Sequence, residues 1–171
     1  MSLKPKIGPA DQTQGNEQAA IKLVEYGDYQ CPHCGTAYPI IKEIQSTFGD
    51  QILFVFRNFP LQESHRYANI AAQAAEAAGK QGKFWEMHDA IFENQQQLNE
   101  EFIEHLAEKL GLDMEEFEED LNSEEISTKV EDDFESGVRS GVNGTPSFFI
   151  NGEKFDGGAA DLLQVLKESG N

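Results

Sequence analysis

Long hydrophobic runs are missing from this sequence. No apolar stretch approaches the roughly 20 residues that are needed to span a bilayer. The first eighteen residues are polar and are interrupted by proline and glycine, so they do not form the apolar core of a signal peptide. We therefore expect a chain that is not membrane-embedded. As written it is expected to be cytoplasmic, or periplasmic or otherwise extracytoplasmic if a leader was removed.

Basic residues are scarce as well. Thirteen Lys and Arg side chains stand against thirty-one Asp and Glu, and the formal net charge of -18 argues against nucleic acid as a partner. The excess of acidic residues is concentrated between Glu93 and Glu135, where seventeen acidic residues accompany two lysines and the net charge is -15. This pattern favours a solvated face of surface helices over an acidic docking surface.

Cysteine is rarer still, because Cys31 and Cys34 are the only two and lie three positions apart. A disulfide that closes so short a loop constrains the unfolded chain little, so stabilisation does not explain the pair. A zinc site would need two further ligands, and the other histidines lack the paired spacing of zinc ligands. We therefore expect no metal. The pair is predicted to be a redox-active dithiol, with no cofactor beyond its own disulfide.

Hydrophobic periodicity indicates an α/β chain. Residues 64–140 have helical spacing throughout, and within them Asp113 followed by Glu116 resembles a capping box. Before and after this block the pattern is typical of strands and single helices. The expected elements are a strand over 20–27, a helix from Pro32 to Phe48, a strand over 51–59, a hairpin over 147–156 with an Asn151-Gly152 turn, and a helix over 160–168.

This order predicts a β-α-β unit, an inserted all-helical subdomain and a closing β-β-α unit. The predicted segments are a flexible N-terminal arm over 1–18, a core formed by 19–62 and 141–171, and a helical insertion over 63–140.

The chemistry is expected around the two cysteines. Pro32 suits the first turn of a helix, so Cys31 is predicted at the amino end of that helix. Unpaired amides and the helix dipole stabilise a thiolate there, so we expect a lowered pKa and nucleophilic character for Cys31. His33 adds a hydrogen-bond donor beside the same sulfur. Cys34, more buried, is predicted to resolve mixed disulfides, and a partly buried Glu25 to exchange a proton with it.

The CPHC motif after LVEYGDYQ, the helical block and the later GVNGTPSFFING resemble the DsbA-like thioredoxin oxidoreductases. The resemblance covers nearly the whole chain from about Ala20 onward. It implies a thioredoxin fold with a helical insertion and a cis peptide bond between Thr145 and Pro146. It also implies that this loop faces Cys31 and binds extended substrate peptides through its backbone, and that Glu25 is the acidic residue of the family near the buried cysteine.

Together these features predict a thiol-disulfide oxidoreductase that acts on protein substrates, either as oxidant or as reductase. Protein thiols or disulfides and a separate redox partner are the expected partners, and the protein is expected to be a monomer. His65, near the start of the helical block, is a further candidate for the active face. Two alternatives remain open: a non-catalytic thioredoxin-like binding module, and a glutathione-linked transferase or isomerase.

Overall fold

The computed structural model describes residues 1–169, and the chain divides into two compact units. One unit comprises Met1–Gly27, Pro32–Arg57 and the residues from Ser136 onward, and the other comprises Asp28–Cys31 and Asn58–Glu135. The helical insertion therefore begins and ends a few residues earlier than the predicted 63–140. The short segment that ends at Cys31 belongs to the helical unit rather than to the first one.

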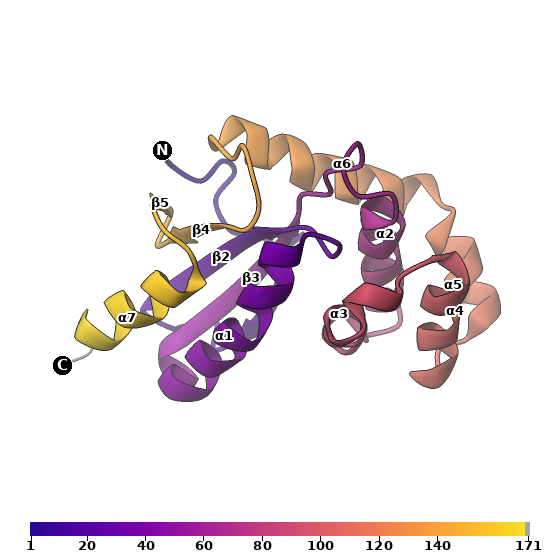
Figure 1. The fold of residues 1–171 in the computed structure, drawn as a ribbon, viewed down its shortest axis with the longest axis horizontal. Helices are drawn as coiled ribbons and strands as arrows, with labels where there is room; N and C mark the ends of the chain where they lie inside the picture. The colour runs from indigo at the N-terminus through magenta and orange to yellow at the C-terminus, as the bar shows by residue number, and fades with distance from the viewer. Residues whose placement is uncertain (170–171) are drawn as a thin grey trace. The chain divides into compact units, whose positions relative to one another are not determined.

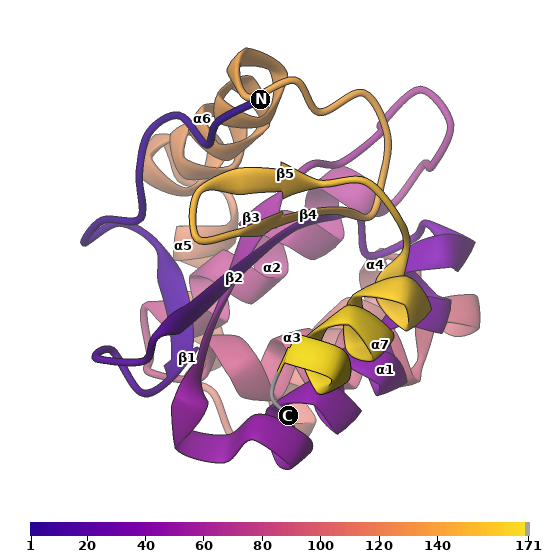
Figure 2. The ribbon, with the colours of Figure 1, turned by 90° about the vertical axis from the view of Figure 1, so that its left-hand side faces the viewer.

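The first unit is built on a five-stranded sheet with the strand order β1-β3-β2-β4-β5 (Figures 1 and 2). Strand β4 runs antiparallel to both β2 and β5. Strand β3, which lies between β1 and β2, consists of buried residues along its whole length, as its uninterrupted apolar run suggests. The strands are β1 (Gln12–Gly15), β2 (Ile21–Gly27), β3 (Ile52–Asn58), β4 (Ser147–Ile150) and β5 (Glu153–Phe155).

The first eighteen residues correct the prediction of an arm without regular structure. Gln12–Gly15 forms β1 and pairs antiparallel with β3, with Gln12 opposite Phe56. Leu3 is buried, and its N–H donates to the carbonyl of Gly152 at 2.8 Å. The segment has no alternation of apolar side chains, so its sequence does not show a strand. The exposed edge of β3 supplies the partners for its backbone groups.

Two helices pack beside each other on the sheet unit, α1 (Pro32–Phe48) and α7 (Ala159–Ser169) (Figure 2). Each buries one apolar stripe at helical spacing, which is the usual way a surface helix covers a core. The buried side chains of α1 are Cys34, Ala37, Ile41, Ile44 and Phe48, and those of α7 are Ala159, Leu162 and Leu166.

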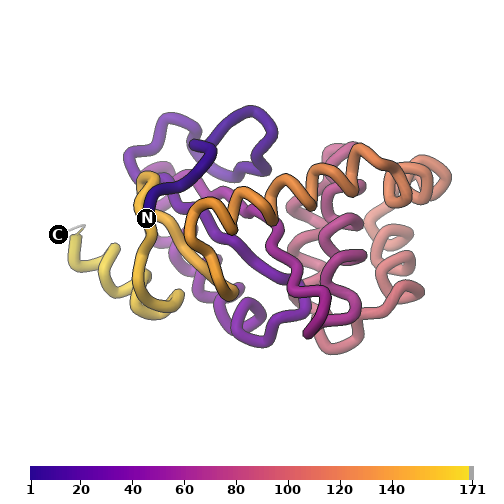
Figure 3. Tube along the Cα trace, turned by 90° about the horizontal axis from the view of Figure 1, so that it is seen from above, coloured from indigo at the N-terminus to yellow at the C-terminus, as the bar shows by residue number. Residues whose placement is uncertain are grey.

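The second unit is all-helical, as predicted for the insertion. Helix α2 contacts α3, α4 and α5, and its closely spaced alanines are buried, which lets neighbouring helices approach (Figure 3). Among the residues that the structure describes, no helix is long and apolar enough to cross a membrane. The helices are α2 (Ala68–Gly79), α3 (Phe84–Glu93), α4 (Glu100–Lys109), α5 (Met114–Leu121) and α6 (Glu124–Arg139), the last four residues of which belong to the first unit.

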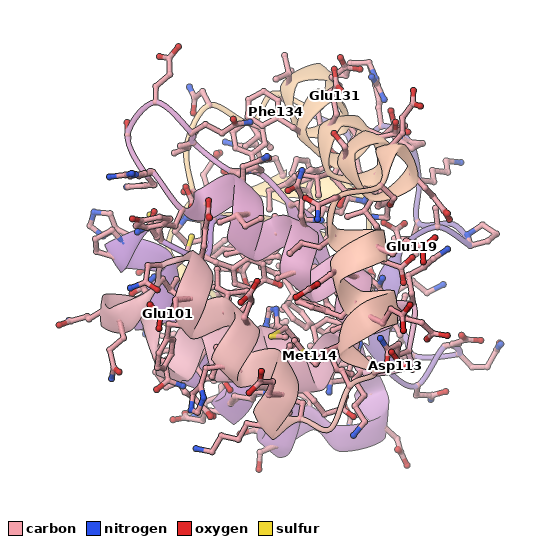
Figure 4. The ribbon with its side chains drawn as sticks, turned by 90° about the vertical axis from the view of Figure 1, so that its right-hand side faces the viewer. Glu101, Asp113, Met114, Glu119, Glu131 and Phe134 are labelled. Carbon is pink, nitrogen blue, oxygen red and sulfur yellow. The ribbon has the colours of Figure 1, made fainter. Side chains whose placement is uncertain are left out.

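The acidic stretch lies mostly on the outside of this helical unit. Glu101, Glu119 and Glu131, on α4, α5 and α6, are exposed (Figure 4). Asp113 caps α5, since its Oδ1 accepts the N–H of Glu116 at 3.1 Å, and this confirms the first half of the predicted capping box. The prediction of a solvated helical face therefore holds for most of these side chains.

Candidate active site

The CPHC motif lies where a turn enters helix α1. Cys31 directly precedes Pro32, the first residue of α1, and its N–H donates to the carbonyl of Asp28 at 3.1 Å. Pro32 fits this position because a first-turn N–H has no partner within the helix. Cys31 is 5% exposed, whereas Cys34 in the first turn is 0% exposed, and no disulfide joins the two residues in this structure. Of the two sulfurs, Cys31 is therefore the more accessible.

The electrostatic surroundings of Cys31 suit an anion. No residue in the first turn of α1 is acidic, so the positive end of the helix dipole is not offset there. The nearest carboxylate in the sequence, Asp28, is 1% exposed and is occupied by other donors. Its Oδ2 accepts from Nδ1 of His65 at 2.7 Å and from the N–H of Leu61 at 3.0 Å.

The loop before β4 forms a small pocket with α1. The peptide bond between Thr145 and Pro146 is cis, as the family resemblance implied. The structure brings these two residues together with His33, which is exposed. The pocket has a volume of about 330 Å³, and its other lining residues are Thr36, Ala37 and Ile40 of α1 and Gly158–Asp161 at the start of α7.

Glu25 lies in β2, as the sequence predicted, and is buried more deeply than the partial burial expected for it. The residue is 3% exposed and lies opposite Phe148 of β4. The neighbouring Gly27 leaves room for it: a Cβ at position 27 would lie 2.9 Å from Glu25 Oε2 and 2.5 Å from a ring carbon of Phe56. The local packing therefore requires glycine at position 27. This packing holds the carboxyl group of Glu25 inside the sheet unit.

Sequence reasoning missed most of the contacts that hold the segment before Cys31. The hydroxyl of Tyr29 lies 2.9 Å from Nδ1 of His88, and its ring packs against Phe92. Gln30 accepts the N–H of Tyr67 at 2.6 Å. Among the side chains that hold this segment, only His65 is a candidate for the active face from the sequence. Its Nδ1 contacts Asp28. The other partners lie far away in sequence, inside a helical pattern that signals packing alone.

Comparison with known proteins identifies the family whose fold this chain shares. A family model described as thioredoxin matches residues 8–168. BdbD from Bacillus subtilis is similar in structure, with a TM-score of 0.80, 27% identity, and coverage of 94% of this chain and 90% of BdbD. The thiol-disulfide exchange protein alpha-DsbA2 from Wolbachia pipientis is similar with a TM-score of 0.81 and 26% identity, over 93% of this chain and 84% of that one.

The chain therefore belongs to the thioredoxin family. Within it, the chain is similar to the DsbA-like thiol-disulfide exchange proteins, and it carries a CXXC pair at Cys31 and Cys34. Curated relatives are longer: Na(+)/H(+) antiporter NhaA 1 of Salinispora arenicola is 42% identical over 147 residues, which are 86% of this chain and 22% of the antiporter. The chain spans about a quarter of the length of the curated relatives it matches.

Proposed function

We propose that Cys31 is the nucleophile and Cys34 the resolving thiol in disulfide exchange with protein substrates. The observation that carries this assignment is the pair of cysteines at the start of α1, of which Cys31 is 5% exposed and Cys34 is 0% exposed. The helix amides stabilise a thiolate on Cys31. A stabilised thiolate favours the reduced pair and makes its disulfide a better oxidant.

In the oxidising direction, a substrate thiolate attacks Sγ of Cys31 in the Cys31–Cys34 disulfide. That bond breaks, and Cys34 leaves as a thiolate and takes up a proton. A second substrate thiolate then attacks the substrate sulfur of the mixed disulfide, and Cys31 leaves as the stabilised thiolate. The substrate loses two electrons and the dithiol gains them. In the reducing direction the same steps run backwards, with Cys34 resolving the mixed disulfide.

Two further groups support these steps. Glu25 is a buried carboxyl group in the same unit as Cys34, and we assign to it the proton that Cys34 gains or loses. The pocket lined by His33, Thr145 and Pro146 is assigned to the substrate peptide, whose backbone would bind along the loop before β4.

The oxidising direction in an extracytoplasmic compartment is the assignment we favour. Protein disulfides form and persist in oxidising compartments, so an oxidant of protein thiols would work there. The longer relatives that the chain matches are named as Na(+)/H(+) antiporters, and these names support a location beside a membrane transport protein. As partners we propose protein thiols as substrates and a separate redox partner that reoxidises the dithiol.

Trapping of the mixed disulfide tests the roles of the two cysteines. Cys34→Ser, mixed with a cysteine-containing peptide in the form of its disulfide-linked dimer, should accumulate a covalent adduct between Cys31 and one peptide copy, seen by mass spectrometry. The Cys31 thiolate attacks the peptide disulfide and the other copy leaves as a thiol, and no second thiol of the protein remains to resolve the adduct. Cys31→Ser should form no adduct and should show no insulin reduction. A redox titration of the unmodified protein against glutathione should show one reversible disulfide. Insulin reduction retained by Cys31→Ser would contradict the role of Cys31 as nucleophile, and absence of a reversible disulfide would contradict the proposal outright.

A further inference from the structure

One side chain of the helical unit, that of Gln95, donates to two backbone carbonyls of the segment that leads into Cys31. Gln95 belongs to the short 3-10 helix Gln95–Gln97 and is 64 positions away from Cys31 in sequence. Its Nε2 donates to the carbonyl of Tyr29 at 2.9 Å and to the carbonyl of Cys31 at 2.8 Å. A side-chain amide has two N–H donors, so both are used on this one segment.

This contact fixes the bend of the segment. Two carbonyls that lie two residues apart converge on one nitrogen, while the N–H of Cys31 donates to Asp28. Both backbone polar groups of Cys31 are therefore engaged within the helical unit. The direction in which the Cys31 side chain leaves the backbone is thus set by Gln95 as well as by the start of α1.

The rest of the segment has its own anchors. Tyr29 contacts His88, and Gln30 accepts from Tyr67, without any help from Gln95. Removal of the Gln95 amide would therefore leave the segment attached to the helical unit. What it would remove is the donor for two partly buried carbonyls, one of which is the carbonyl of the reactive cysteine itself.

We propose that Gln95 is a positioning residue that orients Cys31 at the amino end of α1 and so sets the reactivity of its thiol. This inference rests on the proposed role of Cys31 as nucleophile. Without the amide, the backbone carbonyl of Cys31 loses its donor and the residue is held less firmly at the start of the helix. The thiolate is then less stabilised, and a smaller fraction of Cys31 is ionised at neutral pH.

The test compares Gln95→Ala and Gln95→Glu with the matched control Gln96→Ala. Glutamate keeps the size of the side chain but its carboxylate donates no hydrogen bond, and Gln96 is the neighbouring residue in the same 3-10 helix. The readout is the rate at which iodoacetamide alkylates the reduced protein, measured from pH 4 to pH 9. We expect the midpoint for both Gln95 variants to rise by about one pH unit, which makes alkylation below that midpoint about tenfold slower. Gln96→Ala should match the unmodified protein.

The outcomes separate this inference from the proposed function. If the unmodified protein has a lowered midpoint and folded Gln95 variants share it, Gln95 does not position Cys31, while the nucleophile stands. If the unmodified protein itself reacts only where free cysteine ionises, the proposed function fails. If circular dichroism shows that both Gln95 variants are unfolded, the contact is structural and the positioning role is overturned.

Discussion

Asp133 makes the stability of this protein depend on pH, and a single substitution at this position can measure its contribution. The residue lies on α6, and its Oδ2 accepts from the N–H and from Nδ2 of Asn58 at 3.0 and 2.8 Å. Burial raises the pKa of Asp133 from 3.8 to about 6, although the ammonium group of Lys129 opposes the rise and the carboxylate of Glu76 adds to it.

The sign follows from proton binding. The folded protein holds the proton on Asp133 more tightly than the unfolded chain does, so this carboxyl group favours folding most at pH values below 3.8. That contribution is lost as the pH rises through about 6. A shift of about two pKa units corresponds to about 3 kcal/mol of unfolding free energy, since each unit is worth about 1.4 kcal/mol.

Asp133→Asn removes the ionisation and keeps the shape of the side chain. Urea unfolding of both proteins should be measured from pH 4 to pH 7.5. We expect the unfolding free energy of the unmodified protein, minus that of the variant, to fall by about 2.5 kcal/mol across this range, because part of the loss precedes pH 4. Asp132→Asn, the exposed neighbour on α6, is the matched control and should give a constant difference. Parallel curves for the unmodified protein and Asp133→Asn would refute the reasoning.

Three further substitutions test the packing and chemistry of the sheet unit. Glu25→Gln should slow the resolution of a mixed disulfide by Cys34 on the order of 100-fold, because it removes a proton carrier; a stopped-flow pH profile identical to that of the unmodified protein would argue against this role. Gly27→Ala places a methyl group 2.5 Å from the ring of Phe56 and should destabilise the fold by about 1–3 kcal/mol, read from thermal unfolding. Asp11→Ala removes the carboxylate that pairs with the buried guanidinium of Arg57 at 2.8 Å, and should lower the free energy of urea unfolding by about 3–5 kcal/mol; a loss below 1 kcal/mol would contradict this expectation.

The sequence alone was sufficient wherever the information is local. Pro32 and the apolar stripe behind it predicted α1 and the position of Cys31 at its start. The Asn151-Gly152 pair predicted the hairpin, and both residues do have the positive φ angles, 49° and 88°, that its tight turn requires. The helical spacing of the insertion likewise indicated the fold class, and the spacing of the two cysteines indicated the nucleophile candidate.

Only the tertiary structure decided the contacts between residues that lie far apart in the chain. Strand β1 exists because β3 offers an edge, and Arg57 is buried because Asp11 pairs with it. A polar residue such as Gln95 or Asp133 looks in sequence like any other exposed side chain of a helix. Its partner is brought to it by folding, and a hydrogen bond across 64 positions leaves no periodicity in the sequence. The candidate nucleophile Cys31 is therefore visible in the sequence, whereas Gln95, which donates to its backbone carbonyl, is not.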